Sequence, residues 1–331
     1  MKFSCSFTSE TGEIMIYMLT GASKLTDLSS CVLVLNNTSG LEIRAVTDPS
    51  SAFGKIDIER FAFFRVQSKA NNIIAAEIQI SSLVSAFKSV EHAEDSQFKL
   101  SKNKNGGICF FLTARTFTQI TVTQDIPVVK LLPIDDMNMY REPTLSSVDA
   151  TIAFPDAKMV KTVLDRMKQL DKFVQLKADQ ESGTLVFRVD TEVVSVRTVF
   201  IGLSLNLEEP AQEGGDSQNK ELAQHDSKRR NQFVVATLNT KELSSITGGL
   251  INLQKRVSGI VLAIVRGSAV CLHVSFDDES HLTYYLATAV TDESEPGLEN
   301  DQLLRAETLK GESERVEQEN PEEQLMEQDE F

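Results

Sequence analysis

Tryptophan is absent from the 331 residues, and tyrosine, cysteine and histidine occur only four times each. Without tryptophan, and with few aromatic residues on the predicted helices, the chain has no obvious platform for stacking single-stranded bases. None of the cysteines belongs to a Cys-x-x-Cys pair or lies near a histidine at ligand spacing. We therefore predict reduced core cysteines, and neither a zinc site nor a disulfide framework, for Cys5, Cys31, Cys109 and Cys271.

Catalytic motifs are also missing. The glycine-rich loop that ends in Lys-Ser or Lys-Thr does not occur, and the histidines show no catalytic arrangement. Two acidic runs, Asp135-Asp136 and Asp277-Asp278-Glu279, could gather magnesium as in a metal-dependent nuclease. Both fall in a predicted connector or hairpin turn, where carboxylates are usually hydrated. We expect no enzyme, no cofactor and no metal, with the nuclease as an alternative.

Positive charge is outnumbered, since 48 acidic and 33 basic residues give a net charge of −15. Residues 291–331 hold 15 of the acidic and three of the basic residues, which leaves 33 acidic and 30 basic residues in the first 290. This nearly neutral body can still contact nucleic acid if its basic residues gather on one surface. The acidic tail has few apolar residues to offset its chain entropy, so we expect it to be disordered.

A long uninterrupted apolar segment is lacking as well. Ser258–Val274 is apolar, but Arg266-Gly267 interrupts it, which favours a β-hairpin over a span of ~20 lipid-facing residues. Ile14–Ala22 follows Glu13 and precedes no convincing cleavage site, so a signal peptide is not indicated. We expect a soluble intracellular protein without a membrane partner.

An internal repeat is present, and its clearest copy begins at Val148. A strand-like segment, Val148–Phe154, precedes a helical pattern over Pro155–Leu170, and alternating segments then predict three strands up to Phe200. The same order of strand, helix and strands begins again at Phe3, Ile73 and Phe233. The pattern predicts an α+β protein of two similar halves, each with two βαβββ units and with its helices on one sheet face.

The segments between these units differ in composition. Asp125–Ser147 contains three prolines without a clear period, which indicates an extended connector. Gly202–Asn231 is rich in polar residues and glycine, so we expect a mobile loop. The predicted organisation is a first domain over residues 1–124, a connector over 125–147, a second domain over 148–290 and the tail over 291–331.

Two stretches within this plan resemble the Hus subunit of the heterotrimeric DNA-damage checkpoint clamp, the nine-one-one clamp of the sliding-clamp family. Val122–Pro127, continuing to Leu131-Leu132-Pro133, is similar to the exit of the first domain, and Thr191–Phe200 is similar to the fourth strand of the second domain. The opening Met1-Lys2-Phe3 also fits, while the acidic tail departs from the family. The resemblance covers about residues 1–290.

The resemblance implies a sliding-clamp fold and a ring subunit without chemistry of its own. Its expected partners are two paralogous clamp subunits, which are Rad-nine-like and Rad-one-like, an ATP-dependent clamp loader, and double-stranded DNA bound without sequence specificity. It also implies nuclear localisation and a platform for checkpoint signalling and repair at damaged or stalled sites. A homotrimeric replicative clamp of the same fold is the alternative within the class.

Basic residues on the predicted helices are the candidates for DNA contact. On the helix that follows Pro155, Lys158, Lys161 and Lys168 lie opposite the apolar face, and Asp165 intrudes among them. Because the helices of the resembled family line the channel, these side chains are expected to meet phosphates rather than bases. The complete set of expected DNA-facing residues is Lys24, Lys88, Lys158, Lys161, Lys168, Lys172 and Lys241.

Two strands are expected to pair with neighbouring subunits, by resemblance. They are the last strand of the first domain, predicted over Phe117–Val122, and the strand Val193–Phe200. An open edge with alternating apolar residues is an aggregation hazard unless a partner covers it. The expected interface residues are Phe117, Ile120, Val122, Val194, Val196, Thr198 and Phe200, and the expected connector residues are Asp125, Ile126, Pro127 and Pro133.

Overall fold

The structure is a computed structural model that describes residues 1–25, 28–91, 93–116, 119–145, 147–203, 205, 233–254 and 256–289. Residues 1–289 form one compact unit. Most of the loop predicted over Gly202–Asn231, and the whole acidic tail, lie outside the described residues. Within the described residues, no helix is long and apolar enough to cross a membrane. The apolar Ser258–Val274 forms the predicted hairpin instead, because the strands on either side of Arg266-Gly267 pair in antiparallel register.

Each half of the unit contains the predicted order of strand, helix and three strands twice, and the first half has one additional strand, β5. The elements of the first half are β1 (Lys2–Thr8), α1 (Ser9–Ala22), β2 (Ser30–Asn36), β3 (Gly40–Val46), β4 (Ser51–Ile56), β5 (Phe63–Gln67), β6 (Ile73–Gln79), α2 (Ile80–Lys88), β7 (Ala93–Lys102), β8 (Ile108–Thr116) and β9 (Thr121–Pro127). The elements of the second half are β11 (Ala150–Ala153), α3 (Ala157–Met167), β12 (Phe173–Asp179), β13 (Thr184–Asp190), β14 (Ser195–Phe200), β15 (Val234–Asn239), α5 (Thr240–Leu253), β16 (Gly259–Val265), β17 (Ala269–Asp277) and β18 (Ser280–Ala287). The four predicted units are confirmed.

Three antiparallel sheets are built from these strands. The first-half sheet has the order β5-β1-β7-β8-β9, and the second-half sheet has the order β14-β13-β12-β15. The central sheet has nine strands in the order β10-β6-β2-β3-β4-β18-β17-β16-β11. It crosses from one half to the other where β4 pairs with β18. This continuous sheet makes the halves one compact unit, and the two-domain division stays a prediction.

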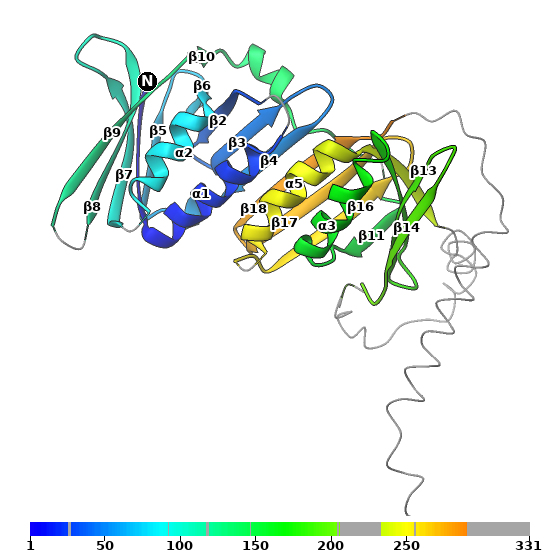
Figure 1. The fold of residues 1–331 in the computed structure, drawn as a ribbon. Coiled ribbons are helices and arrows are strands. Elements are labelled where there is room, and N and C mark those ends of the chain that lie inside the picture. The colour runs from blue at the N-terminus through cyan, green and yellow to red at the C-terminus, as the bar shows by residue number, and fades with distance from the viewer. Residues whose placement is uncertain are drawn as a thin grey trace, which may run out of the picture. The chain divides into compact units, whose positions relative to one another are not determined.

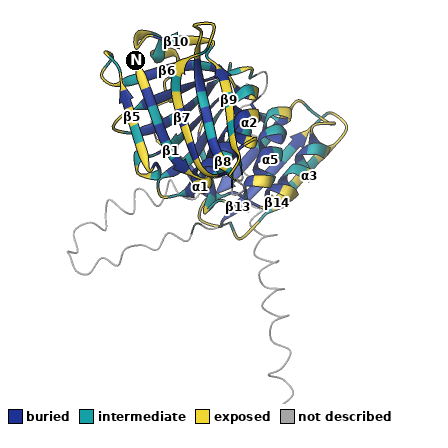
Figure 2. Ribbon diagram, turned by 90° about the vertical axis from the view of Figure 1, so that its left-hand side faces the viewer, coloured by how far each residue is buried: buried dark blue, intermediate teal, exposed yellow. Residues whose placement is uncertain are grey.

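The helices lie together on one side of the sheets, as Figure 1 shows for α1, α2, α3 and α5. Their buried faces join one large apolar core with the inward side chains of all three sheets. The alternation of burial along the strands of the first-half sheet is visible in Figure 2 as alternating dark and light bands. One side of that sheet packs on the core and the other is solvated, which is the arrangement expected of an antiparallel sheet.

The sequence analysis did not predict the strands β4, β5 and β10 (Lys130–Leu132). The segment of β4 contains Gly54, which lowers its strand propensity and interrupts its apolar pattern. In the structure a Cβ at Gly54 would lie 3.3 Å from Met18 Sδ, so α1 packs directly on the strand at this glycine. The tertiary contact, rather than local propensity, explains why the segment is a strand.

The predicted connector is more regular than its composition indicates. The strand β9 continues through Pro127, so Asp125, Ile126 and Pro127 pair with β8 instead of leaving the sheet. Strand β10 (Lys130–Leu132) then pairs with β6 at one edge of the central sheet, and the 3₁₀ helix η2 (Asp135–Tyr140) follows. Pro133 separates β10 from η2. Proline is tolerated at the end of β9 because its missing N–H then costs no further ladder bond.

The two predicted subunit edges need corrected bounds. The strand predicted over Phe117–Val122 begins later, at Thr121, so the exposed Ile120 precedes it, and Phe117 lies outside the described residues. The strand predicted from Val193 begins at Ser195. Val194 belongs to the preceding turn, where its N–H donates to Thr191 Oγ1 over 3.0 Å and its carbonyl accepts from the Thr191 N–H over 2.9 Å. The threonine hydroxyl thus stabilises the turn in place of a strand.

Candidate DNA-binding surface and subunit edges

The helix α3 carries Lys158 and Lys161, and Lys168 follows as its C-terminal cap residue. Asp156 caps it by accepting a hydrogen bond from the Met159 N–H over 2.9 Å, and Pro155 therefore precedes the helix rather than starting it. The buried side of α3 is apolar. Lys158 and Lys168 are exposed, as the helical spacing predicts, but Lys161 is partly buried against α5.

The carboxylate of Asp165 lies between two of these lysines. Its Oδ1 forms an ion pair with Lys161 Nζ, and Lys168 Nζ lies 2.7 Å away from the same oxygen. The Ser244 hydroxyl of α5 donates to Oδ1 over 2.9 Å and accepts from Lys161 Nζ over 3.0 Å. Hydrogen bonds from Lys161 and Lys168 hold the pKa of the Asp165 carboxyl far below its usual range, so it is ionised throughout the neutral pH range. The group Lys161, Asp165, Lys168 and Ser244 is called the Asp165 cluster below.

Two glycines of α5 bring lysines from both neighbouring helices onto its surface. A Cβ at Gly248 would lie 3.1 Å from Lys161 Cε, and a Cβ at Gly249 would lie 2.8 Å from Lys24 Cγ. The Ser245 hydroxyl also donates to the Lys24 carbonyl over 2.8 Å. The glycine pair therefore allows Lys24 and Lys161 to lie against α5 from opposite sides, which the spacing of lysines alone does not reveal.

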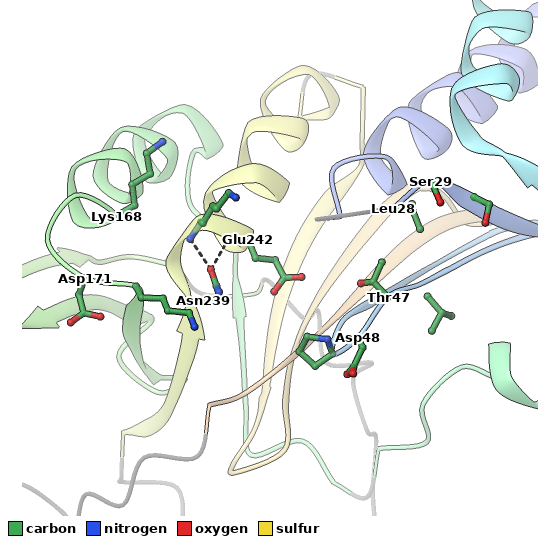
Figure 3. A pocket seen from close by; sticks show the side chains of 13 residues that line it. Leu28, Ser29, Thr47, Asp48, Lys168, Asp171, Asn239 and Glu242 are labelled. Carbon is green, nitrogen blue, oxygen red and sulfur yellow. Dashed lines mark hydrogen bonds between the residues drawn. The ribbon is translucent and has the colours of Figure 1, made fainter.

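The remaining lysines lie near helix ends. Lys168, Lys172 and Lys241 line a pocket of about 650 Å³, together with Asp171 and Glu242. In Figure 3, Lys168 and Asp171 follow α3 and lie across the hollow from Thr47 and Asp48 of the first half. The Nζ of Lys172 lies 5.1 Å from the Phe173 ring centroid. Lys88 is exposed at the end of α2. Carboxylates around this pocket balance its lysines, so it is not a strongly positive site.

The candidate interface strands are both edges of their sheets. The terminal strands of the first-half sheet are β5 and β9, and those of the second-half sheet are β14 and β15. Along β14, Val196, Thr198 and Phe200 are half-buried and alternate with exposed residues. The rings of Phe187 and Phe200 lie 5.7 Å apart in an edge-to-face contact, and Val122 of β9 packs on the core. These side chains fix the strands to their own sheets, and the outward backbone groups are what an added strand would pair with.

The acidic runs singled out in the sequence are close to basic side chains. Asp277 and Glu279 lie in the hairpin between β17 and β18. Arg60 forms an ion pair with Asp277, and its Nε lies 3.1 Å from Glu279 Oε2. Lys130 Nζ lies 3.3 Å from Asp136 Oδ2. Among the described residues, no group of three or more histidine, cysteine or acidic side chains is arranged to hold a metal ion. The acidic hairpin is thus a structural ion-pair network around Arg60.

All four cysteines are buried and free, which confirms that they are core residues. Burial raises the pKa of Cys31 to about 12 and that of Cys271 to about 11. Because the thiolate is the reactive form, these thiols are inert at neutral pH.

The outer face of the central sheet holds a histidine pair, His273 and His281, whose ring centroids lie 5.2 Å apart. Burial lowers the pKa of both histidines, so the pair is neutral near pH 7.

Two repeated halves, helices on one side of the sheets and the edge strands β9 and β14 define a protein of the sliding-clamp class. The crystal structure of proliferating cellular nuclear antigen from Entamoeba histolytica is similar to this chain with a TM-score of 0.62. That similarity covers 87% of this chain and 99% of the other at 11% sequence identity. At so low an identity it establishes the fold, and the predicted clamp architecture is confirmed.

The family follows from the sequence comparisons. The Hus1-like protein family matches residues 1–290. Checkpoint protein hus1 of Schizosaccharomyces pombe is 30% identical over 240 residues, which cover 70% of this chain and 79% of that protein. Checkpoint protein HUS1 of Homo sapiens is 29% identical over 136 residues, covering 40% of this chain and 48% of the human protein. The chain belongs to the Hus1-like family, which confirms the resemblance and supports a checkpoint-clamp subunit over a replicative clamp or a nuclease.

Proposed function

We propose that this chain is one subunit of a heterotrimeric ring that is loaded onto double-stranded DNA at damaged or stalled sites. Membership of the Hus1-like family carries the proposal, and the position of β9 and β14 as edge strands of their sheets supports it. One edge pairs with a Rad-nine-like subunit and the other with a Rad-one-like subunit. Each contact extends a sheet across the subunit boundary, so that main-chain hydrogen bonds supply affinity and side chains supply the choice of partner.

The DNA contact is electrostatic and independent of sequence. Lys88, Lys158 and Lys241 lie on helices, and Lys24 and Lys168 lie just beyond the ends of α1 and α3. The helices share one side of the sheets (Figure 1), which is the side that would line the ring. Lysines of this kind neutralise phosphates without reading bases, which permits the ring to slide. The chain has no chemistry of its own in this role, so opening the ring requires a separate ATP-dependent loader. A protein with this function is expected in the nucleus.

The proposed heterotrimer is tested by measuring which subunits associate with this chain in solution. The full chain, purified alone and with the two paralogous subunits, is separated by size-exclusion chromatography with light scattering. A complex of one copy of each subunit is expected, because two different partners cover the two edges. A stable trimer of this chain alone would instead assign it to the homotrimeric clamps. A magnesium-dependent nuclease assay on the same samples tests the remaining alternative, for which no cleavage of DNA is expected.

A further inference from the structure

The Asp165 cluster places an internal anion on the helix surface that we propose meets DNA. Three donors, from Lys161, Lys168 and Ser244, converge on the single oxygen Asp165 Oδ1. Ammonium and hydroxyl groups that converge on one oxygen in this way also form the usual coordination of a phosphate oxygen. The carboxylate therefore occupies the position in which these donors could hold a phosphate of the backbone.

The cluster is accessible enough for exchange. The side chains of Asp165 and Lys168 are 40% and 41% exposed, while that of Lys161 is 26% exposed. Gly248 allows the Lys161 stem to lie flat on α5, which holds its ammonium beside Ser244. The cluster as a whole carries one net positive charge, although its two lysines carry two. Solvent and salt screen these partly exposed ion pairs, so a phosphate, which is also an anion, can compete with the carboxylate for the two lysines.

We propose that Asp165 is an autoinhibitory residue that competes with DNA phosphate for Lys161 and Lys168, and so lowers the affinity of the ring for DNA. The inference rests on the proposed function, because it assumes that α3 faces the duplex. A carboxylate that returns to its lysines when a phosphate leaves lowers the cost of moving from one phosphate to the next. The surface then favours sliding over tight binding.

The decisive variant is Asp165→Asn in the assembled ring. Its amide oxygen can still accept from Ser244, but it no longer neutralises the lysines. With one added phosphate contact, the variant is expected to bind random-sequence duplex about tenfold more tightly than wild type at 50 mM salt. The salt slope steepens by about 0.9, so its advantage over wild type shrinks about 3.5-fold between 50 and 200 mM salt. Asp165→Glu retains the charge and should restore wild-type affinity.

Two further variants distinguish failure of this inference from failure of the proposed function. The DNA affinity of every variant is measured by fluorescence anisotropy with the same labelled duplex. Asp136→Asn also removes one negative charge, but from an ion pair on the connector, and is expected to bind as wild type does. Lys158→Ala tests the proposed DNA surface itself and should flatten the salt slope. If Lys158→Ala weakens binding while Asp165→Asn matches wild type or binds more weakly, this inference is overturned and the proposed function stands. If neither change alters binding, the DNA-facing assignment of α3 is itself wrong.

Discussion

Single side chains decide how much charge the helix surface of this protein offers. A helical wheel places Lys161 and Lys168 on the exposed face of α3, but the position of their ammonium groups depends on Asp165 and on Ser244 of α5. Removing Lys158, Lys161 and Lys168 together would flatten the salt slope by up to ~2.7 if each held its own phosphate. With Asp165 in place we expect a smaller change, because the cluster contributes one net charge rather than two.

Arg60 joins the two halves through ion pairs, so its loss should destabilise the junction between them. Its side chain is 22% exposed and lies beside Asp277 and Glu279 of the β17–β18 hairpin, while Glu10 of α1 lies 3.7 Å from it. Arg60→Ala leaves these carboxylates close together without their cation. We expect the free energy of unfolding to fall by about 1–3 kcal/mol, as measured by urea denaturation followed by circular dichroism.

Arg256 provides the matched control for Arg60. It also pairs with a carboxylate, Glu13, at 3.4 Å, but its side chain is 59% exposed. Arg256→Ala is therefore expected to change the free energy of unfolding by about 0.5 kcal/mol or less. Equal stability of the two variants would mean that the Arg60 network does not contribute to holding the hairpin.

At the scale of elements, the proposal that β14 is a subunit edge predicts how substitutions in this strand affect binding of the partner subunits. Consecutive residues of a strand direct their N–H groups to opposite sides, so Val196 and Val199 donate in opposite directions, one toward β13 and one away from the sheet. A proline removes the donor at its position. Of Val196→Pro and Val199→Pro, one should unfold the edge, and the other should leave a folded subunit that no longer binds one of its two partners.

This prediction is measured by pull-down of each paralogous subunit, with thermal denaturation of the free chain as the folding control. The informative variant keeps the wild-type melting temperature, loses one partner and retains the other, because the second partner would pair with β9. Retention of both partners by a folded variant would show that β14 is not a subunit edge. The strand β9 would then need the same pair of substitutions.

At the scale of the whole molecule, the charge of the acidic tail predicts an effect on DNA affinity. Residues 291–331 carry a net charge of −12 and follow the body directly after its last strand. A tethered polyanion competes with phosphate for the same lysines and is screened by salt. Deleting residues 291–331 should raise the DNA affinity of the ring at low salt and leave ring assembly unchanged, with a smaller difference at higher salt.

The alternative for the tail is a docking peptide, with Leu303-Leu304 and Leu325-Met326 as its apolar anchors. Truncation would then remove a protein partner without changing DNA affinity. Titration of full-length and truncated rings with duplex DNA at two salt concentrations decides between these functions. Equal affinities at both concentrations would exclude charge masking by the tail.

The repeat and the positions of most strands could be predicted because they depend on local periodicity. The pattern from Val148 to Phe200 contains its own apolar alternation, and the structure places one helix and its strands there. The bounds of β9 and β14 were less accurate, since a turn such as Thr191–Val194 is decided by one hydroxyl. The candidate site was predicted in part, because the lysines of α3 are visible as a face but their ion pairs are not.

By itself, the sequence determined the α+β repeat, the buried cysteines, the uneven charge and the family to which the chain belongs, since each depends on composition or on neighbours along the chain. Tertiary structure decided that β4 pairs with β18, that Arg60 occupies the acidic hairpin and that Asp165 holds two lysines beside Ser244. These contacts join residues that are far apart along the chain, for example 217 positions in the case of Arg60 and Asp277. Tertiary packing brings such groups together, and local sequence patterns therefore do not predict these contacts.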